Sequence, residues 1–196
     1  MHERLELLDW KRRVFALYQD VRAARDPEQA WDRWRAVREE LYTAHPQSPR
    51  LGAVPRYFDY DPRFRVAATV EPTAPELVHV NGSAASVVPF TRFARVRFEL
   101  LGERRSLELY WLEAYGGGVF LPFADATSGG ETYGAGRYLL DTVKGADLGG
   151  NDGALVLDFN FAYNPSCSYD DRWACPLAPP ANRLDLRVEA GELSPG

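Results

Sequence analysis

Apolar side chains recur every three or four residues in the first quarter of the chain, a spacing that predicts two amphipathic helices. The first predicted helix covers residues 3–24, and its apolar stripe consists of Leu7, Trp10, Val14, Leu17 and Val21. The second covers residues 27–42. Asp26 is in place to cap this second helix, and Pro27 fits its first turn.

The second predicted helix carries its own apolar stripe, which consists of Trp31, Trp34, Val37 and Leu41. We expect both tryptophans to be core contacts. The helix must end near His45-Pro46, because a residue that precedes proline avoids the helical conformation.

From residue 64 onward the period changes to two, which predicts strands. The expected strands are residues 64–70, 93–100, 107–111, 119–121, 137–140, 155–159 and 184–188. Gly102-Glu103 is the expected hairpin turn between the second and the third. Short strands separated by turn residues favour an antiparallel barrel or sandwich.

The predicted fold class is therefore α+β: two N-terminal helices followed by an antiparallel β-barrel or sandwich of about eight strands. We expect one domain over residues 1–196, with a helical segment at 1–45 and a β domain at 55–192. Residues 193–196 are expected to form a frayed tail.

Charge and composition narrow the classes of function. The 196 residues carry a net charge of −5 with a pI near 5.3, which argues against a nucleic-acid-binding protein, because such proteins need a basic face.

No stretch has the ~20 apolar residues of a membrane span, and the first residues lack the apolar core of a signal peptide. We therefore expect a cytoplasmic protein that does not associate with membranes. The three histidines are not spaced as a metal pair.

Polar residues and glycines interrupt the strand pattern at residues 122–139, which makes this segment the first candidate site. The candidate ligand-binding residues here are Asp125, Thr127, Ser128, Glu131, Thr132, Tyr133 and Arg137. Arg137 begins a predicted strand and could clamp a carboxylate or phosphate with two hydrogen bonds. The alternative is a structured turn whose side chains bond the nearby backbone.

A second polar segment, residues 157–167, supplies the other candidates. Alternation places Asp158 and Asn160 on one strand face, and Tyr163 and Asn164 follow. Arg137 is a candidate partner for Asp158, either in a buried structural salt bridge or in a substrate site.

Cys167 and Cys175 are the two cysteines of the chain, and three interpretations of them remain open. Structural cysteines, buried or bridged, are favoured, although a disulfide is disfavoured in a reducing cytoplasm. A metal site would need two more ligands, and a catalytic thiolate would need a base. The proline-rich residues 175–183 form either one wall of a pocket or an ordered connection.

These motifs also carry a family resemblance. Residues 121–139, 157–167 and 175–184, with His45-Pro-Gln-Ser-Pro49 and residues 57–65 upstream, resemble the bacterial and archaeal family called domain of unknown function 1684. The resemblance covers nearly the whole chain and implies no established activity. Some members look like exported lipoproteins with the same cysteine spacing, and this resemblance makes a disulfide more plausible here.

Three hypotheses of function follow. We favour a small-molecule-binding protein or an enzyme whose polar site is built by residues 122–138 and 157–167, with an anionic small molecule as the candidate ligand and Arg137 holding it. The alternative is a non-enzymatic interaction or structural module, in which Trp31 and Trp34 anchor a partner or a second copy in a homo-oligomer. A third is a cation site built by Asp125, Glu131 and Asp158. No metal site is assigned, and the reaction and the cofactor are left open.

Overall fold

Two long helices open the chain in the computed structural model, which describes residues 2–85, 87–151 and 153–195. Helix α1 covers His2–Ala23 and helix α2 covers Pro27–Ala44. The Asp26 carboxylate caps α2 by accepting hydrogen bonds from two backbone N–H groups of its first turn, and α2 ends at His45 in extended conformation. Both helices predicted from the apolar period are confirmed to within two residues.

Seven strands then form one antiparallel sheet: β1 (Arg65–Asn81), β2 (Val87–Leu100), β3 (Glu103–Leu112), β4 (Val119–Phe123), β5 (Arg137–Asp141), β6 (Gly150–Asn151) and β7 (Ala154–Asp158). Their order across the sheet is β5-β4-β3-β2-β1-β7-β6. Leu101 and Gly102, both with positive φ, make the tight turn between β2 and β3. The short 3-10 turns η1 to η6 cover Pro62–Phe64, Ser83–Ala85, Thr142–Lys144, Phe159–Phe161, Ser166–Ser168 and Pro180–Asn182.

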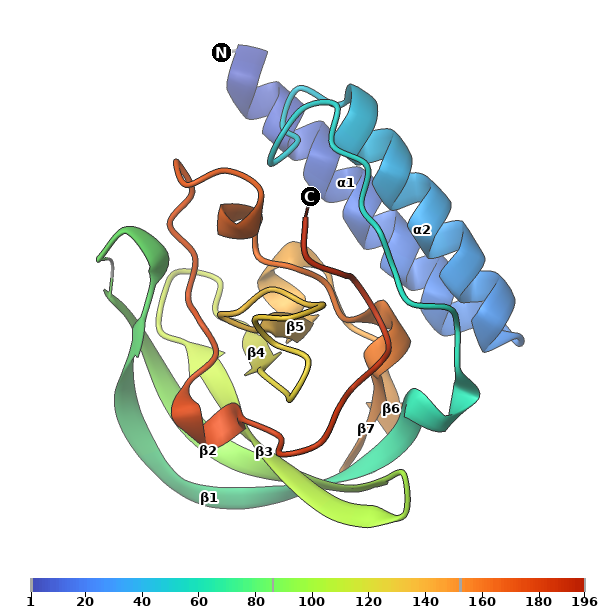
Figure 1. Ribbon diagram of the computed structural model, residues 1–196. Helices are drawn as coiled ribbons and strands as arrows, with labels where there is room; N and C mark the ends of the chain where they lie inside the picture. The colour runs from blue at the N-terminus through green and yellow to red at the C-terminus, as the bar shows by residue number, and fades with distance from the viewer. Residues whose placement is uncertain (1, 86, 152, 196) are drawn as a thin grey trace.

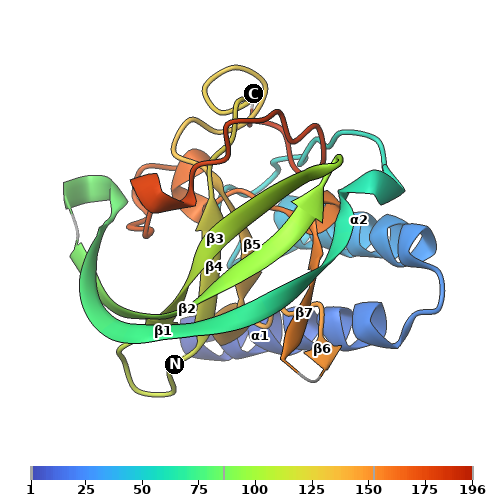
Figure 2. The same cartoon turned by 90° about the horizontal axis from the view of Figure 1, so that it is seen from below.

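The sheet curves strongly but strand pairing does not close it (Figures 1 and 2). Near its two edges Tyr138 of β5 and Tyr163, beyond β7, exchange backbone hydrogen bonds of 2.8 and 3.1 Å. The predicted α+β class is confirmed, with an open seven-stranded sheet in the place of the barrel or sandwich.

The chain after residue 182 differs from the prediction, because residues 184–188 do not form a strand. These residues belong to what we call the C-terminal segment, residues 183–194, which runs along the open end of the sheet (Figure 1). Much of its backbone bonds to side chains, as described below, and this leaves it irregular. The predicted frayed tail is also wrong, since the N–H groups of Leu193 and Ser194 donate to the carbonyls of Arg56 and Glu131 at 2.8 Å. Gly196 lies outside the described residues.

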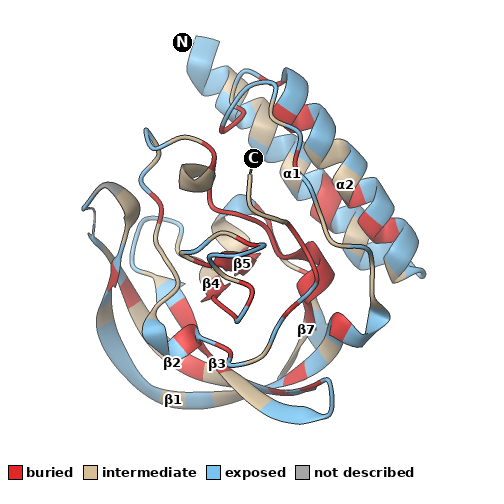
Figure 3. Cartoon of the chain, in the orientation of Figure 1, coloured by how far each residue is buried: buried red, intermediate tan, exposed pale blue. Residues whose placement is uncertain are grey.

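Two large apolar clusters and a third, small one, formed by Leu41, Tyr42 and Tyr169, make up the core. One large cluster joins the strands to the C-terminal segment, through residues such as Val96, Phe123 and Val188. The other large cluster joins the helices to the sheet and includes Trp31 and Trp34, both buried within this chain. As Figure 3 shows, α2 buries one face against the sheet while α1 is largely exposed. The two tryptophans are therefore not free to anchor a partner.

A bilayer-crossing helix is not found among the residues that the structure describes, because no helix there combines the necessary length with apolar composition.

Candidate functional site

Arg137, the first residue of β5, is fully buried and holds the C-terminal segment. Its Nη2 donates to Asp125 Oδ1 at 3.2 Å and to the Val188 carbonyl at 3.1 Å. Its Nη1 donates to the carbonyls of Ala190 and Glu192. Burial lowers the pKa of Arg137 against the opposing effect of Asp125, yet a guanidinium stays charged in proteins. The two terminal nitrogens of the guanidinium are therefore occupied by Asp125 and by backbone carbonyls, while its buried Nε has no hydrogen-bond partner.

The Asp125 carboxylate accepts hydrogen bonds from several internal partners on both of its oxygens. Its Oδ2 accepts hydrogen bonds from the N–H and the hydroxyl of Thr127, at 3.0 and 2.7 Å, and from the Val188 N–H at 2.8 Å. The Thr127 hydroxyl also contacts that of Thr132 at 2.9 Å, and the Ser128 hydroxyl accepts from the Asp125 N–H at 3.1 Å. The segment is thus a structured turn whose buried groups bond one another and the C-terminal segment.

Asp158 does not pair with Arg137, so that predicted pair is wrong. Arg65 of β1 lies directly opposite Asp158 in the β1–β7 register and donates to its Oδ2 at 3.1 Å. The other oxygen, Oδ1, accepts from the N–H and the amide of Asn160, at 3.1 and 2.8 Å. Burial raises the pKa of Asp158, against the lowering effect of these hydrogen bonds.

The cation site predicted from Asp125, Glu131 and Asp158 is not assembled. Glu131 is exposed and pairs with Arg187 at 2.5 Å, while the other two carboxylates have separate buried partners. Within residues 2–85, 87–151 and 153–195, no three histidine, cysteine or acidic side chains group so as to hold a metal ion.

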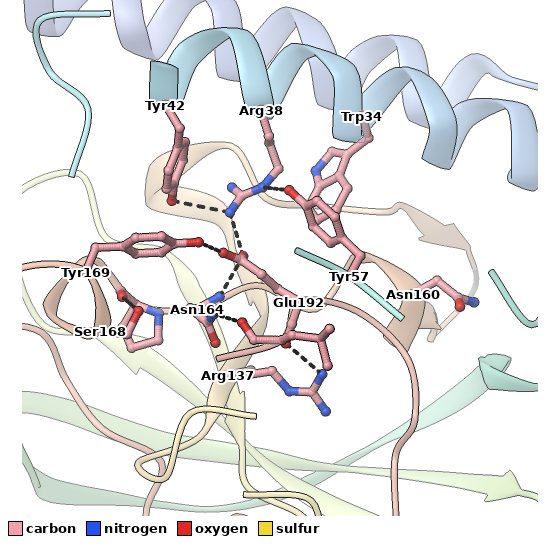
Figure 4. Close-up of polar contacts among 12 residues, drawn as sticks. Trp34, Arg38, Tyr42, Tyr57, Arg137, Asn160, Asn164, Ser168, Tyr169 and Glu192 are labelled. Atoms are coloured by element: carbon pink, nitrogen blue, oxygen red, sulfur yellow. Dashed lines mark hydrogen bonds and ion pairs between the residues drawn. The ribbon is translucent and has the colours of Figure 1, made fainter. Parts of the chain in front are cut away.

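A second buried ion pair, Arg38–Glu192, joins α2 to the C-terminal segment (Figure 4). Arg38 Nη2 donates to Glu192 Oε2 at 2.7 Å, and the same oxygen accepts from the Asn164 N–H at 3.0 Å. Tyr169 donates its hydroxyl proton to Glu192 Oε1, and Arg38 also donates to the hydroxyl of Tyr42 at 3.3 Å. Burial raises the pKa of Tyr42 to about 12, so its hydroxyl stays protonated at neutral pH.

This ion pair is not among those expected from the sequence, although one signal for it is present. Arg38 lies about one helical turn after Trp34 and one turn before Leu41, on the same face of α2 as these two apolar residues. A charged residue in an apolar stripe faces the core and therefore needs a buried partner. Nothing in the sequence indicates that this partner is Glu192, which lies 154 residues further on.

Beside this ion pair lies what we call the helix-capped cavity, with a volume of about 70 Å³. Its lining combines residues of α1 and α2 with the end of the second polar motif: Trp10, Val14, Tyr18, Arg38, Tyr42, Pro49, Lys144, Ala146, Tyr163, Asn164, Pro165 and Ser166. Two polar groups on this lining lack partners among the described residues: Arg38 Nη1 has no hydrogen bond, and Asn164 Oδ1 is buried without one.

The aromatic rings of the cavity region surround the Arg38 guanidinium. Its central carbon lies 4.8 Å from the ring centre of Trp34 and 5.0 Å from those of Tyr42 and Tyr163. Lys144 lies on the same lining, and its ammonium pairs with Asp141 at 3.2 Å. Both charged residues on the lining are thus cations.

The two cysteines lie side by side as free thiols. The Cys167 N–H donates to Cys175 Sγ at 3.3 Å, and the Tyr133 hydroxyl lies 3.8 Å from Cys167 Sγ. Hydrogen bonding from the Cys175 thiol, assisted by Ser83 and Tyr133, lowers the pKa of Cys167 to about 6 despite partial burial. The same contact, together with burial, raises the pKa of Cys175.

We expect this asymmetry to control alkylation, since the thiolate is the reactive form. The rate at which iodoacetamide modifies Cys167, followed by peptide mass spectrometry, is predicted to reach half its maximum near pH 6. A Cys175→Ala variant removes the donor and should move this midpoint toward the ordinary value of about 8.5. A midpoint near 8.5 in the unsubstituted protein, or faster modification of Cys175, would contradict the arrangement.

The predicted site residues therefore separate into several places rather than one. Asp125, Thr127, Ser128, Thr132 and Arg137 form one buried cluster. Asp158 and Asn160 form another, Tyr133 contacts Cys167, and Glu131 lies on the surface. Tyr163 and Asn164 line the helix-capped cavity.

Comparison with known proteins gives a family but no activity. A family model described as "Protein of unknown function (DUF1684)" matches residues 54–193. The solution NMR structure of an uncharacterized protein from gene locus rrnAC0354 of Haloarcula marismortui is 34% identical, with a TM-score of 0.62. That match covers 85% of this chain and 93% of the archaeal chain. No curated protein matches. On the family match and this similarity, the chain belongs to the DUF1684 family.

Proposed function

We propose that this protein binds a small anionic molecule in the helix-capped cavity, with Arg38 and Lys144 holding its carboxylate. The observation that carries the proposal is the pair of unpartnered groups on the lining. Arg38 Nη1 offers a free hydrogen-bond donor, and Asn164 Oδ1 is a buried acceptor without a donor. Buried polar groups are nearly always bonded, so the unpartnered Asn164 Oδ1, on the same small cavity as the unused Nη1 donor of Arg38, favours a ligand.

The charges favour an anion. The two charged residues on the lining are cations, while the carboxylates that pair with them, Asp141 and Glu192, are not part of the lining. A guanidinium can bind a carboxylate while retaining its other hydrogen bonds, because it carries five N–H donors. Asn164 Oδ1 would accept a hydrogen bond from a hydroxyl or ammonium group on the same ligand.

The size limits the ligand. Drug-sized molecules occupy about 300–1,000 Å³, whereas this cavity has about 70 Å³. Acetate and glycolate are the size that we expect.

The two lysines of the chain supply a matched test. Lys144→Met removes the ammonium from the cavity lining and keeps the apolar stem, while Lys11→Met makes the same change at an exposed position of α1. We expect the first to weaken glycolate binding about tenfold, equivalent to about 1.4 kcal/mol, and the second to leave it unchanged. Calorimetric titration at constant ionic strength measures both. Equal affinities in the two variants, or no glycolate binding beyond that of chloride, would contradict the proposal.

A further inference from the structure

A separate cleft lies where residues 177–181, which we call the proline strap, cross the sheet. At one end the Leu177 N–H donates to the Asn81 carbonyl at the end of β1, at 2.9 Å. At the other end the Asn182 amide donates to the carbonyls of Glu108 and Pro122, at 3.0 and 2.7 Å. Held at both ends, the strap spans β1 to β3 and leaves a cleft of about 280 Å³ beneath it.

The two walls of this strap cleft are largely apolar. The strap contributes Leu177, Ala178, Pro179, Pro180 and Ala181, and the sheet contributes Val78, Val80 and the ring of Tyr110. Pro179 and Pro180 have no N–H to offer a ligand and fix the path of the strap. A preformed slot between a proline strap and a sheet suits a flat ring.

On the sheet side of the strap cleft, Glu108 and Arg92 form a long ion pair whose two facing atoms lack a hydrogen bond. Glu108 is buried, and its Oε1 accepts two hydrogen bonds from Arg95, at 3.0 and 2.5 Å. Its Oε2 has no hydrogen-bond partner, and neither has the Nε of Arg92, although both atoms are buried. The two atoms are 3.9 Å apart, too far for a hydrogen bond to each other.

The charges of the strap cleft are already balanced. Arg92 Nη2 pairs with Glu76 at 2.8 Å, and Arg95 neutralises Glu108. Unlike the lining of the helix-capped cavity, the lining of this cleft carries both signs of charge, with Glu76 and Glu108 beside Arg92, and it therefore favours a neutral ligand over an ion. What the strap cleft lacks is one donor for Glu108 Oε2 and one acceptor for Arg92 Nε.

We infer that the strap cleft binds a neutral, flat ligand that carries an N–H group beside a carbonyl in one ring, as in a cyclic amide. The ring N–H donates to Glu108 Oε2, and the carbonyl accepts from Arg92 Nε. The ring itself lies between the proline strap and Tyr110. This site shares no lining residue with the helix-capped cavity, so either proposal can fail alone.

The probe for this site is 2-pyridone, a planar cyclic amide, and its control is N-methyl-2-pyridone, which lacks the N–H. In a two-dimensional ¹H–¹⁵N NMR titration of the whole protein, we expect 2-pyridone to shift the amides of Val78, Val80, Tyr110 and Leu177. The N-methyl control should bind at least tenfold more weakly, since it leaves Glu108 Oε2 without a donor. Equal binding of the two probes, no shift at these amides, or a preference for butylammonium over 2-pyridone would overturn the inference.

Three variants make the test specific. Glu108→Gln keeps the shape of the side chain but replaces the acceptor Oε2 by an amide NH2 group, which is a donor. We expect this change to weaken 2-pyridone binding at least tenfold. Glu99→Gln is the matched control, because Glu99 is exposed on β2 and does not line the strap cleft. Val78→Phe fills the cleft from a half-buried position, and should abolish binding even if Glu108→Gln fails to fold. Unchanged affinity in either cleft variant would contradict the assignment.

Discussion

Replacing Arg137 with methionine is expected to destabilise the protein by about 3–5 kcal/mol, because the change leaves the buried Asp125 carboxylate without its cation. The same change removes the donors that hold the carbonyls of Val188 and Ala190, on the C-terminal segment. Urea denaturation followed by circular dichroism measures the loss. The matched control is Arg187→Met, at a solvent-exposed pair with Glu131, which should leave the free energy of unfolding nearly unchanged.

A cost below about 1 kcal/mol for Arg137→Met would mean that the apolar contacts of the C-terminal segment suffice to hold it. In that case the Arg137 guanidinium of the unsubstituted protein would not be needed for stability and could hold a ligand, as the sequence suggested.

Replacing Arg38 with methionine is the second change for which we expect a large effect, again about 3–5 kcal/mol. Glu192, fully buried, would then keep only the hydrogen bonds from Tyr169 and the Asn164 N–H. Arg38 connects α2 to the C-terminal segment. We therefore expect the unfolding transition, followed by tryptophan fluorescence to which the neighbouring Trp34 contributes, to occur at a lower urea concentration than in the unsubstituted protein.

A double-mutant cycle separates the charge from the packing. Adding Glu192→Gln to Arg38→Met removes the unpaired charge, so the double variant should recover at least about 1 kcal/mol of the loss. Additive costs in the cycle would mean that Arg38 stabilises the fold through its aromatic contacts with Trp34 and Tyr42 rather than through Glu192.

Local patterns predicted the helices and most of the strands because those elements bond within themselves or to near neighbours. The period of 3.6 residues and the Asp26-Pro27 cap located α2, and the period of two located β2 and β3. Residues 184–188 do not form the expected strand, and the reason is physical. Their backbone groups bond to Asp125 and Arg137, far away in the sequence, and alternation of apolar residues cannot reveal such partners.

The candidate site shows the same limit more sharply. Counting polar residues identified Asp125, Arg137 and Asp158 correctly as unusual, because all three are buried and charged. Sequence spacing could not identify their partners. The partner of Asp158 is Arg65, because the register of β1 and β7 places these two residues opposite each other. Arg38 and Lys144, which we propose to hold the ligand, lie outside both polar motifs and meet Tyr163 and Asn164 through the fold alone.

The hydrogen-bond partners and the position of each polar residue therefore separate the expected roles. The terminal nitrogens of Arg137 and both oxygens of Asp125 bond to each other, to Thr127 and to the C-terminal segment, so loss of either residue should lower the stability of the protein. Arg38 and Asn164 each retain one unused group beside the helix-capped cavity, and these unused groups should be seen in binding.

The most direct test of this account is a two-dimensional ¹H–¹⁵N NMR titration of the unsubstituted protein with sodium acetate at constant ionic strength. We predict saturable shifts that are largest at the amides of Ala146, Tyr163, Asn164 and Ser166, which line the helix-capped cavity. Saturable shifts centred instead on residues 125–137 would show that Arg137 is the anion site after all. Uniform, non-saturating shifts would show that the helix-capped cavity binds no carboxylate, and either result would contradict the account.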